Sequence, residues 1–318
     1  MWISPYKYVL SLGHLCSDIN QSILSAVLPF LIATYHYDYT IATMLVTVSN
    51  VFGAFVQPFI GMLSDKKNKL LYMTLGVLLA SGGMAVTGFI SNFFGLCIVV
   101  IISGIGVVMF HPQAAKLVNS VSSKNAKGKG MSIFSFGGKV GFTLGPVYTA
   151  FLMNLFGMKG TILFLIPGIV FGIVCSFFNK DFENLDVLEV EKKEKVKSEQ
   201  KDDWSGFIKL CCVVFSRSIL SNGISTFLAF YFIQQFSKSN SFASMLLSVF
   251  YGIGSITLLG GGIADCFGHR KMVRLSFCIF LPAIFIFTNT SHFVIALIML
   301  IFMTCGESLS YSPMVVLG

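Results

Sequence analysis

The chain has 318 residues, of which 55% are apolar, 14% are aromatic and only 11% are charged. A soluble domain carries about 25% charged residues, and no water-soluble core of this size could hide so much apolar surface. The composition therefore excludes an ordinary soluble domain and predicts an integral membrane protein with several spans. The net charge is +8, but no basic groove interleaved with stacking aromatics is evident, so we expect no nucleic-acid partner.

Apolar segments of about 20 residues, the length that crosses a hydrocarbon core of about 30 Å, recur along the chain. They predict an all-α fold, a multi-span helical bundle, with the first segment as a spanning helix rather than a cleaved signal peptide. The ten predicted helices cover residues 8–34, 43–62, 70–90, 93–111, 130–154, 160–178, 207–235, 243–264, 272–289 and 293–311.

A strongly charged stretch, residues 179–206, interrupts this pattern and is predicted to be a solvated linker. It divides the chain into an N-terminal half of six helices, residues 1–178, and a half of four helices, residues 207–318. If the halves are equal, two helices are missing from the second. We favour a truncated chain, and the alternative is a protein that works with an incomplete second half.

The placement of Lys and Arg predicts the orientation. Sixteen of these residues lie in the even-numbered connections between helices, and two lie in the odd-numbered connections. Because cytoplasmic loops carry the excess of positive charge, we expect the N-terminus and the 179–206 linker to lie in the cytoplasm.

Two turns that lie 200 residues apart repeat one pattern of Gly, Asp and cations. The first reads Gly61-Met-Leu-Ser-Asp65-Lys66-Lys-Asn-Lys69, and the second reads Gly261-Gly-Ile-Ala-Asp265-Cys-Phe-Gly268-His-Arg270. The repeat predicts two pseudo-symmetric halves with a substrate path between them. We interpret the two turns as gates, in which each Asp pairs across to a neighbouring helix. The alternative is a topology-setting loop with a capping Asp.

These paired turns, with six helices before a charged central loop, resemble the major facilitator superfamily. Asn68 and Cys266 depart from its turn pattern, at a Gly and at a cation respectively. Three stretches of the first half also resemble fosmidomycin resistance proteins: residues 11–22, residues 110–112 and residues 132–146. The resemblance implies a fold with about ten of the usual twelve helices, in a bacterial inner (plasma) membrane. It also implies proton-coupled efflux of a small molecule, such as an antibiotic, by alternating access.

His14 and Asp18 lie four residues apart on the first helix and therefore share one face. A charge at membrane depth costs at least about 2.5–3.5 kcal/mol, so such residues usually face a cavity or a partner. The functional interpretation is a proton site at Asp18 with His14 as relay. Gln21 continues the same helix face and is interpreted as a substrate contact. The alternative is a buried polar clamp between helices.

Four further ionisable residues are candidates for the proton or substrate pathway. His111 precedes Pro112, which we expect to end the fourth helix, and it is assigned a gating or proton role. Lys139 is expected either to pair with Asp18 or to receive an anionic substrate group, with snorkelling as the alternative. Arg217 and Glu307 are the buried-charge candidates of the second half, and the alternative for Arg217 is snorkelling to the nearby cytoplasmic end.

Glycines recur at every fourth position of the fifth helix, at Gly137, Gly141 and Gly145, and Pro146 follows. Small residues at this spacing let two helices approach closely, so we predict a packing and kink element.

The remaining expectations concern chemistry and partners. The chain lacks HExxH, GxSxG and Walker motifs and any metal-spaced Cys/His cluster, so we expect no enzyme, no cofactor and no metal site. The expected partners are the lipid bilayer, a small-molecule substrate and protons, and we expect a monomer. The alternatives to efflux are proton-linked nutrient uptake and a transport-inactive remnant.

Overall fold

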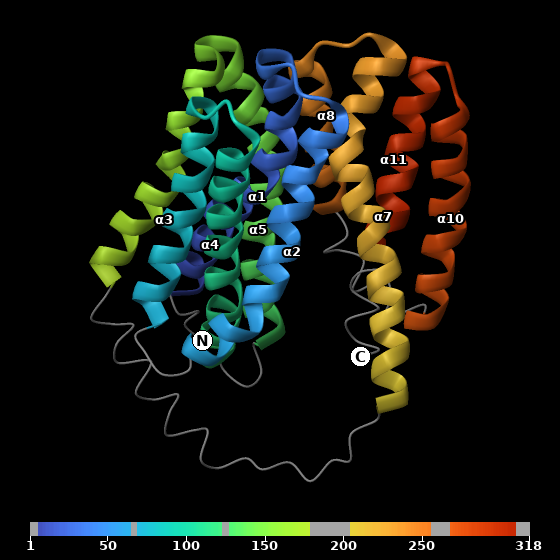
Figure 1. Ribbon diagram of the computed structural model, residues 1–318. Helices are drawn as coiled ribbons and strands as arrows, with labels where there is room; N and C mark the ends of the chain where they lie inside the picture. The colour runs from blue at the N-terminus through green and yellow to red at the C-terminus, as the bar shows by residue number, and fades with distance from the viewer. Residues whose placement is uncertain (1–5, 65–68, 123–126, 179–203, 256–267, 310–318) are drawn as a thin grey trace. The chain divides into compact units, whose positions relative to one another are not determined.

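A computed structural model describes residues 6–64, 69–122, 127–178, 204–255 and 268–309 (Figure 1). The described chain is built from helices, as predicted, and no strand occurs in these ranges. It forms two compact units, Met1–Lys197 and Ser198–Gly318. The helices of the first unit are α1 (Tyr6–Tyr35), α2 (Tyr39–Ser64), α3 (Lys69–Val86), α4 (Phe93–Ser120), α5 (Lys127–Phe156) and a helix over 166–178, with 3-10 turns at Thr87–Phe89 and Gly157–Leu165. Those of the second unit are α7 (Trp204–Phe236), α8 (Asn240–Ser255), α10 (His269–Asn289) and α11 (Phe293–Leu309).

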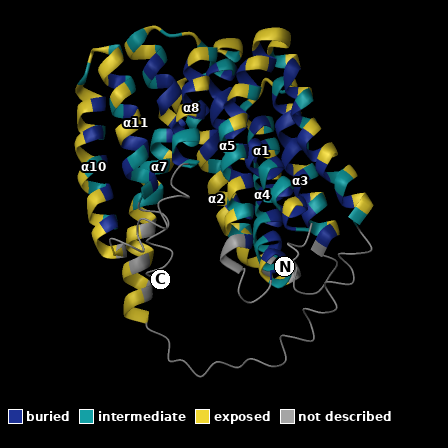
Figure 2. Cartoon of the chain, turned by 180° about the vertical axis from the view of Figure 1, so that it is seen from behind, coloured by how far each residue is buried: buried dark blue, intermediate teal, exposed yellow. Residues whose placement is uncertain are grey.

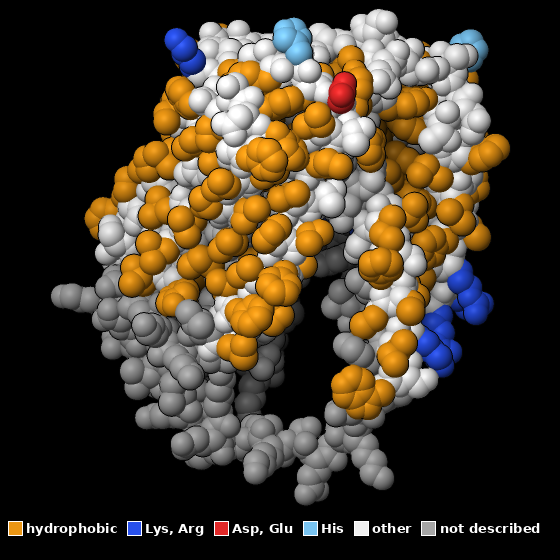
Figure 3. Space-filling model, in the orientation of Figure 1, with side chains coloured by type: hydrophobic (Ala, Val, Ile, Leu, Met, Phe, Trp, Pro, Cys, Tyr) orange, Lys and Arg blue, Asp and Glu red, His pale blue; other side chains and the backbone are white. Residues whose placement is uncertain are grey.

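The described helices have the length and surface of membrane spans. Seven stretches are long and apolar enough to cross a bilayer, and the shorter α11 is also apolar. On the face drawn in Figure 3, hydrophobic side chains cover the middle of the helices, and charged side chains lie toward the helix ends. Large apolar side chains such as Phe94 and Phe177 are 79% exposed, which lipid favours and water does not. The predicted span 243–264 is described as far as Ser255.

The helix bounds agree with the prediction to within about one turn, with two exceptions. The sixth helix was expected from residue 160, but Gly157–Leu165 is a 3-10 segment and the α-helix covers 166–178. The fourth helix was expected to end at His111, but α4 continues through Pro112 to Ser120. Proline is tolerated inside membrane helices because neighbouring helices and side chains satisfy the backbone groups that it frees. Residues 204–206, expected in the linker, begin α7. The rest of the predicted linker lies outside the described residues.

Helix α1 forms the centre of the first unit. It is buried along most of its length, whereas yellow exposed faces run along α2 and α10 in Figure 2. Apolar side chains from four helices close around it in one core cluster, which includes Leu10, Met73, Phe110, Phe134 and Phe171. The first helix is therefore held rigidly where it carries His14 and Asp18.

The helix contacts repeat with a period of 200 residues. Helices α3 and α10 begin at Lys69 and His269, and α4 and α11 begin at Phe93 and Phe293. A Cβ added at Gly106 would meet Gly76 and Ala80 of α3, and one added at Gly306 would meet Ser276 and Phe280 of α10. Both contacts have the same spacing, so the third and fourth helices of each unit pack in the same register. This repeat agrees with the prediction of two pseudo-symmetric halves.

A buried carboxylate between two histidines

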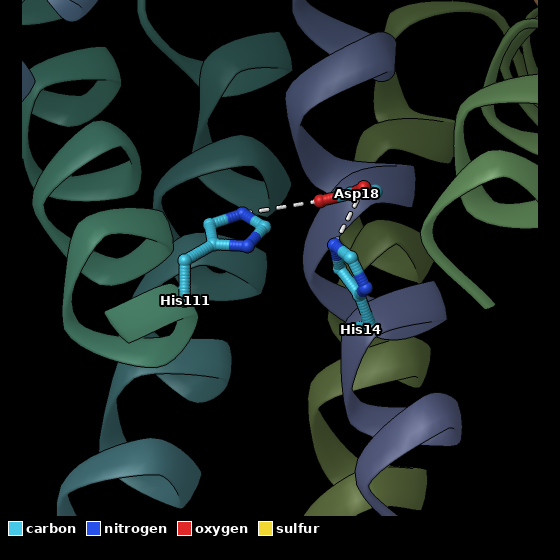
Figure 4. A group of neighbouring side chains, drawn as sticks. All are labelled: His14, Asp18 and His111. Carbon is cyan, nitrogen blue, oxygen red and sulfur yellow. Dashed lines mark ion pairs between the residues drawn. The ribbon is translucent and has the colours of Figure 1, made fainter. Parts of the chain in front are cut away.

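Asp18 lies at the centre of the candidate site. Its carboxylate is on α1 and is buried, with only 5% of the side chain exposed. Oδ2 lies 3.2 Å from Nε2 of His14, one turn earlier on the same helix, and Oδ1 lies 3.2 Å from Nε2 of His111 on α4 (Figure 4). The structure therefore brings His111 to the pair of residues that the sequence placed on one face, and it joins α1 to α4 through one carboxylate.

His14 is held in place by helix α5. Its Nδ1 lies 2.8 Å from the carbonyl oxygen of Phe134, and its ring stacks on the Phe134 ring with centroids 4.1 Å apart. Since a carbonyl oxygen can only accept, Nδ1 must donate a hydrogen to it. The second ring nitrogen of a neutral His14 would then present a lone pair to Asp18.

The contact between His14 and Asp18 requires a hydrogen. Two lone pairs that face each other at 3.2 Å repel, so the contact between His14 and Asp18 needs a hydrogen on Nε2 or on the carboxyl group. Nε2 of His111 lies 3.2 Å from the other oxygen of Asp18, and this oxygen accepts no hydrogen bond from the described residues. His111 is also the most open member, with 32% of its side chain exposed against 14% for His14. The cluster is therefore most open at His111.

Gly138 of α5 leaves the space for this pair. A Cβ at this position would lie 2.5 Å from Oδ2 of Asp18 and 2.6 Å from Nε2 of His14. No real Cβ tolerates such contacts, so any other residue at 138 would displace one of the two side chains. Sequence reasoning missed both Gly138 and Phe134. The available signal was the pair of adjacent glycines. Gly137 belongs to the predicted packing face, and Gly138 leaves a neighbouring face of the same helix free of side chains.

The predicted glycine seam lies against α1. Added Cβ atoms at Gly137, Gly141 and Gly145 would meet the backbone oxygens of Ser11 and Leu15 and the hydroxyl of Ser22. Pro146 lies inside α5 and is buried. The close approach also lets the Ser11 hydroxyl donate to the carbonyl oxygen of Ile133 at 2.8 Å.

The other candidates of the first unit surround this centre. Lys139 of α5 is half-buried, and its charge acts electrostatically on His14, while the ion pairs of Asp18 in the described residues run to the two histidines. Gln21 lies three residues after Asp18 and is exposed. The donor atoms of His14, Asp18 and His111 lie within 4.8 Å of one another, which also meets the spacing of a metal-ligand set. A separation of 3.2 Å suits a shared hydrogen and the ligand atoms of a metal ion alike.

The two candidates of the second unit form one ion pair. Nη2 of Arg217 on α7 donates to Oε1 of Glu307 on α11, and the side chains are 15% and 10% exposed. The sequence identified both residues but gave no indication that they meet, because they are 90 positions apart.

The gating turns lie largely outside the described residues, which omit Asp65, Lys66, Gly261 and Asp265. Gly61 and Lys69 lie in the last turn of α2 and at the start of α3. Gly268 precedes α10 with φ of 91°, a backbone conformation that favours glycine, and Arg270 is exposed in the first turn of that helix.

Long apolar helices around a buried cluster of ionisable side chains define a class of membrane transport proteins. A family model described as Major Facilitator Superfamily matches residues 10–318. The chain belongs to this superfamily.

Curated relatives agree with this family. The chain is 23% identical over 276 residues to the fosmidomycin resistance protein of Escherichia coli K12, a match that covers 83% of this chain and 66% of that protein. It is 24% identical over 278 residues to the uncharacterized transporter YfnC of Bacillus subtilis, covering 85% and 68%. It is also 27% identical over 148 residues to the multi-drug resistance efflux pump PmrA of Streptococcus pneumoniae, covering 45% and 36%. The chain thus spans about two thirds of the length of the first two relatives.

Solved structures share the fold. An inward-facing, occupied bacterial homologue of the lysosomal transporter Spinster matches with a TM-score of 0.80 at 16% identity, covering 98% of this chain and 73% of that one. The inward-open xylose transporter XylE of E. coli matches with a TM-score of 0.76 at 15% identity, covering 98% and 81%.

Proposed function

We propose that this chain is a proton-coupled carrier that exports a small organic molecule by alternating access. His14, Asp18 and His111 form its proton site. The observation that carries the proposal is the contact between His14 and Asp18, which requires a hydrogen because the other ring nitrogen of His14 donates to Phe134. A site that needs a proton to be stable, and that has a partly exposed histidine at its edge, can load and release that proton.

The groups that face Asp18 define the charge change. On its own helix it faces His14, and from α4 it faces His111, while Lys139 of α5 acts on His14. Loading a proton makes the cluster more positive by one charge and strengthens the pairing of α1 with α4 through Asp18. Release of the proton leaves a lone pair of His14 against the carboxylate and weakens this pairing. Protonation thereby biases the packing of two helices, as alternating access requires.

The direction of transport is argued from the relatives. Two of them are named for resistance or efflux, the fosmidomycin resistance protein and the pump PmrA. The xylose transporter and the Spinster homologue are matched as structures, at 15% and 16% identity, and support the fold alone. We therefore prefer export in exchange for protons over proton-linked uptake.

Asp18→Asn tests the proton site. In everted vesicles with a respiration-acidified interior, an exporter exchanges external drug for internal protons, so adding fosmidomycin or a panel of other antibiotics should dissipate the acidity. The variant should lose this response by at least about tenfold, because a neutral amide cannot hold the proton with His14. Asp38→Asn, an exposed Asp in the connection between α1 and α2, is the matched control and should behave as the wild type.

Two results would contradict the proposal. Drug-driven proton release that survives in a well-expressed Asp18→Asn variant would remove Asp18 from the coupling. Accumulation of the same compounds in whole cells, raised by expression and abolished by a protonophore, would reverse the direction to uptake.

A further inference from the structure

The cluster of His14, Asp18 and His111 has the dimensions of a metal site. Nε2 of each histidine lies 3.2 Å from a carboxylate oxygen of Asp18, and the three ligand atoms lie within 4.8 Å of one another (Figure 4). A tetrahedral ion with bonds of about 2.0 Å holds its ligand atoms about 3.3 Å apart. The separations in the cluster therefore fit an ion that is bound by two imidazoles and one carboxylate.

One oxygen of Asp18 lacks a hydrogen-bond partner. Oδ1 is buried and accepts no hydrogen bond from the described residues, although Nε2 of His111 lies 3.2 Å away. A buried carboxylate oxygen in this state is costly, because it has lost its contact with water and has gained no donor in return. A cation between this oxygen and the imidazole nitrogens would satisfy it.

His14 is oriented as metal-binding histidines are. Its Nδ1 donates to the carbonyl oxygen of Phe134 at 2.8 Å, which leaves the lone pair of Nε2 for another partner. A histidine that binds a metal through one nitrogen almost always donates the other N–H to a carbonyl or a carboxylate. The Phe134 ring also stacks on the imidazole and fixes its plane. The lone pair that requires a hydrogen in the absence of metal can therefore bind an ion instead.

The backbone of α5 passes close to the pair without filling the space beside it. A Cβ at Gly138 would lie 2.5 Å from Oδ2 of Asp18 and 2.6 Å from Nε2 of His14. The bare glycine therefore keeps two of the three ligand atoms free of a side chain from the neighbouring helix.

The ligand types select the metal. Two imidazoles and one carboxylate suit Zn²⁺, Co²⁺ and Ni²⁺, whereas Mg²⁺ and Ca²⁺ prefer oxygen ligands alone. Asp18 supplies one negative charge, and the charge of Lys139 on α5, which acts on His14, opposes a cation. This balance favours an ion that bonds to neutral nitrogen over one that is held by charge alone.

We propose that His14, Asp18 and His111 bind a divalent transition-metal ion of the Zn²⁺ type, which replaces the hydrogen between His14 and Asp18. The binding is argued from the geometry of the first unit alone. Its consequence rests on the transport function proposed above: an ion that bridges α1 and α4 excludes the proton, so Zn²⁺ blocks proton-coupled flux. The sequence predicted no metal site because His111 is far from the other two ligands along the chain.

Co²⁺ is the probe for binding, because its visible absorption bands intensify when the ion becomes four-coordinate. The full chain is purified in detergent through a tag without histidine and is titrated at one neutral pH. A variant with all eight cysteines replaced is titrated in parallel, which excludes binding by thiolates. Both should give a saturable spectrum with one ion per chain. Zn²⁺ should displace Co²⁺, whereas Mg²⁺ and Ca²⁺ at the same concentration should not.

Two substitutions test the ligands. Asp18→Asn and His111→Gln should each weaken Co²⁺ binding by at least about tenfold, because each removes one ligand. His292→Gln, at an exposed histidine of the second unit, is the matched control and should bind Co²⁺ as the wild type does.

X-ray absorption at the Zn edge identifies the ligands without any substitution, so the test stands if a variant fails to fold. The Zn²⁺-loaded wild type should show bonds of about 2.0–2.2 Å and the outer-shell scattering of two imidazole rings. No Co²⁺ binding at millimolar concentration, unchanged binding in a folded Asp18→Asn or His111→Gln variant, or a Zn²⁺ spectrum without imidazole scattering would overturn the metal site.

The effect on flux is measured separately in everted vesicles. The proton gradient is imposed by dilution of ammonium, so that inhibition of respiration by Zn²⁺ plays no part. Saturating Zn²⁺ should abolish drug-dependent proton release, and unchanged release would overturn the block. If proton release depends on Asp18 but no metal binds, the transport function stands and the metal site fails. If metal binds through the three residues but no drug drives proton release, the metal site stands and the transport proposal fails.

Discussion

At the scale of single residues, the space at Gly138 decides whether His14 and Asp18 can keep their 3.2 Å contact. An added Cβ would lie 2.5 Å from the Asp18 carboxylate and 2.6 Å from the His14 ring. Gly138→Ala should therefore displace one of these side chains, lower the proton-coupled flux by at least about tenfold and destabilise the fold by about 1–3 kcal/mol. Flux in vesicles and thermal unfolding in detergent measure the two effects.

Gly82→Ala is the control for this substitution. Gly82 lies in α3, and a Cβ added there would meet nothing within 4 Å. Because alanine is the better helix former, this variant should be neutral or more stable by up to about 1 kcal/mol. Normal coupling in a folded Gly138→Ala variant would show that the His14–Asp18 contact is not needed for transport.

The proton site was partly predictable from these residues. The spacing of His14 and Asp18 follows from the helix period, so sequence alone placed them on one face. The contact of Asp18 with His111 depends on how α1 and α4 pack, and no local pattern encodes that register. Phe134 contributes a backbone carbonyl to His14, and a carbonyl belongs to every residue, so its role is visible only once α5 is placed beside α1.

At the scale of elements, the glycines of α5 approach α1 in two ways, against a side chain and against the backbone. An added Cβ at Gly145 would strike the hydroxyl of Ser22, and one at Gly137 would strike the backbone oxygen of Ser11. Gly145→Ala and Gly137→Ala should each destabilise the protein by about 1–3 kcal/mol in thermal unfolding. Ser22→Ala should partly restore Gly145→Ala, because it removes the atom that is struck.

The matched double variant pairs Gly137→Ala with Ser11→Ala. It should show no comparable recovery, since the backbone oxygen remains. Equal rescue in both double variants would mean that the helices shift apart freely and that the seam does not fix their distance. Lack of any destabilisation by Gly137→Ala would contradict the packing role of the glycines.

Helix α4 shows where a local rule gives way to its surroundings. In water, Pro112 would end a helix by removing a hydrogen bond and crowding the preceding turn. Within α4 the helix continues to Ser120, so His111 stands in the middle of a long helix instead of at its end. His111 is therefore not a helix-terminal residue, as was predicted, but a residue within the helix whose side chain points toward Asp18. Prediction of helix ends from proline alone is least reliable in membrane spans for this reason.

At the scale of the whole molecule, the 200-residue period was predictable from the turns, but its strongest support lies elsewhere. Gly106 and Gly306 contact the third helix of their units at positions that differ by 200 throughout. The left-handed residues after the first helices, His36 and Ser237, recur at nearly the same interval. The repeat thus extends to packing positions but not to the ionisable residues, which are Asp18 with two histidines in one unit and Arg217 with Glu307 in the other.

The orientation in the membrane is the last prediction and follows from charge alone. With sixteen Lys and Arg in one set of connections and two in the other, the 179–206 linker is expected in the cytoplasm and Lys159 outside. In a background with all eight cysteines replaced, an impermeant maleimide should label Lys159→Cys on intact cells. Lys193→Cys should react only after permeabilisation, with Lys238→Cys as a second external position. The reverse pattern would invert the predicted topology.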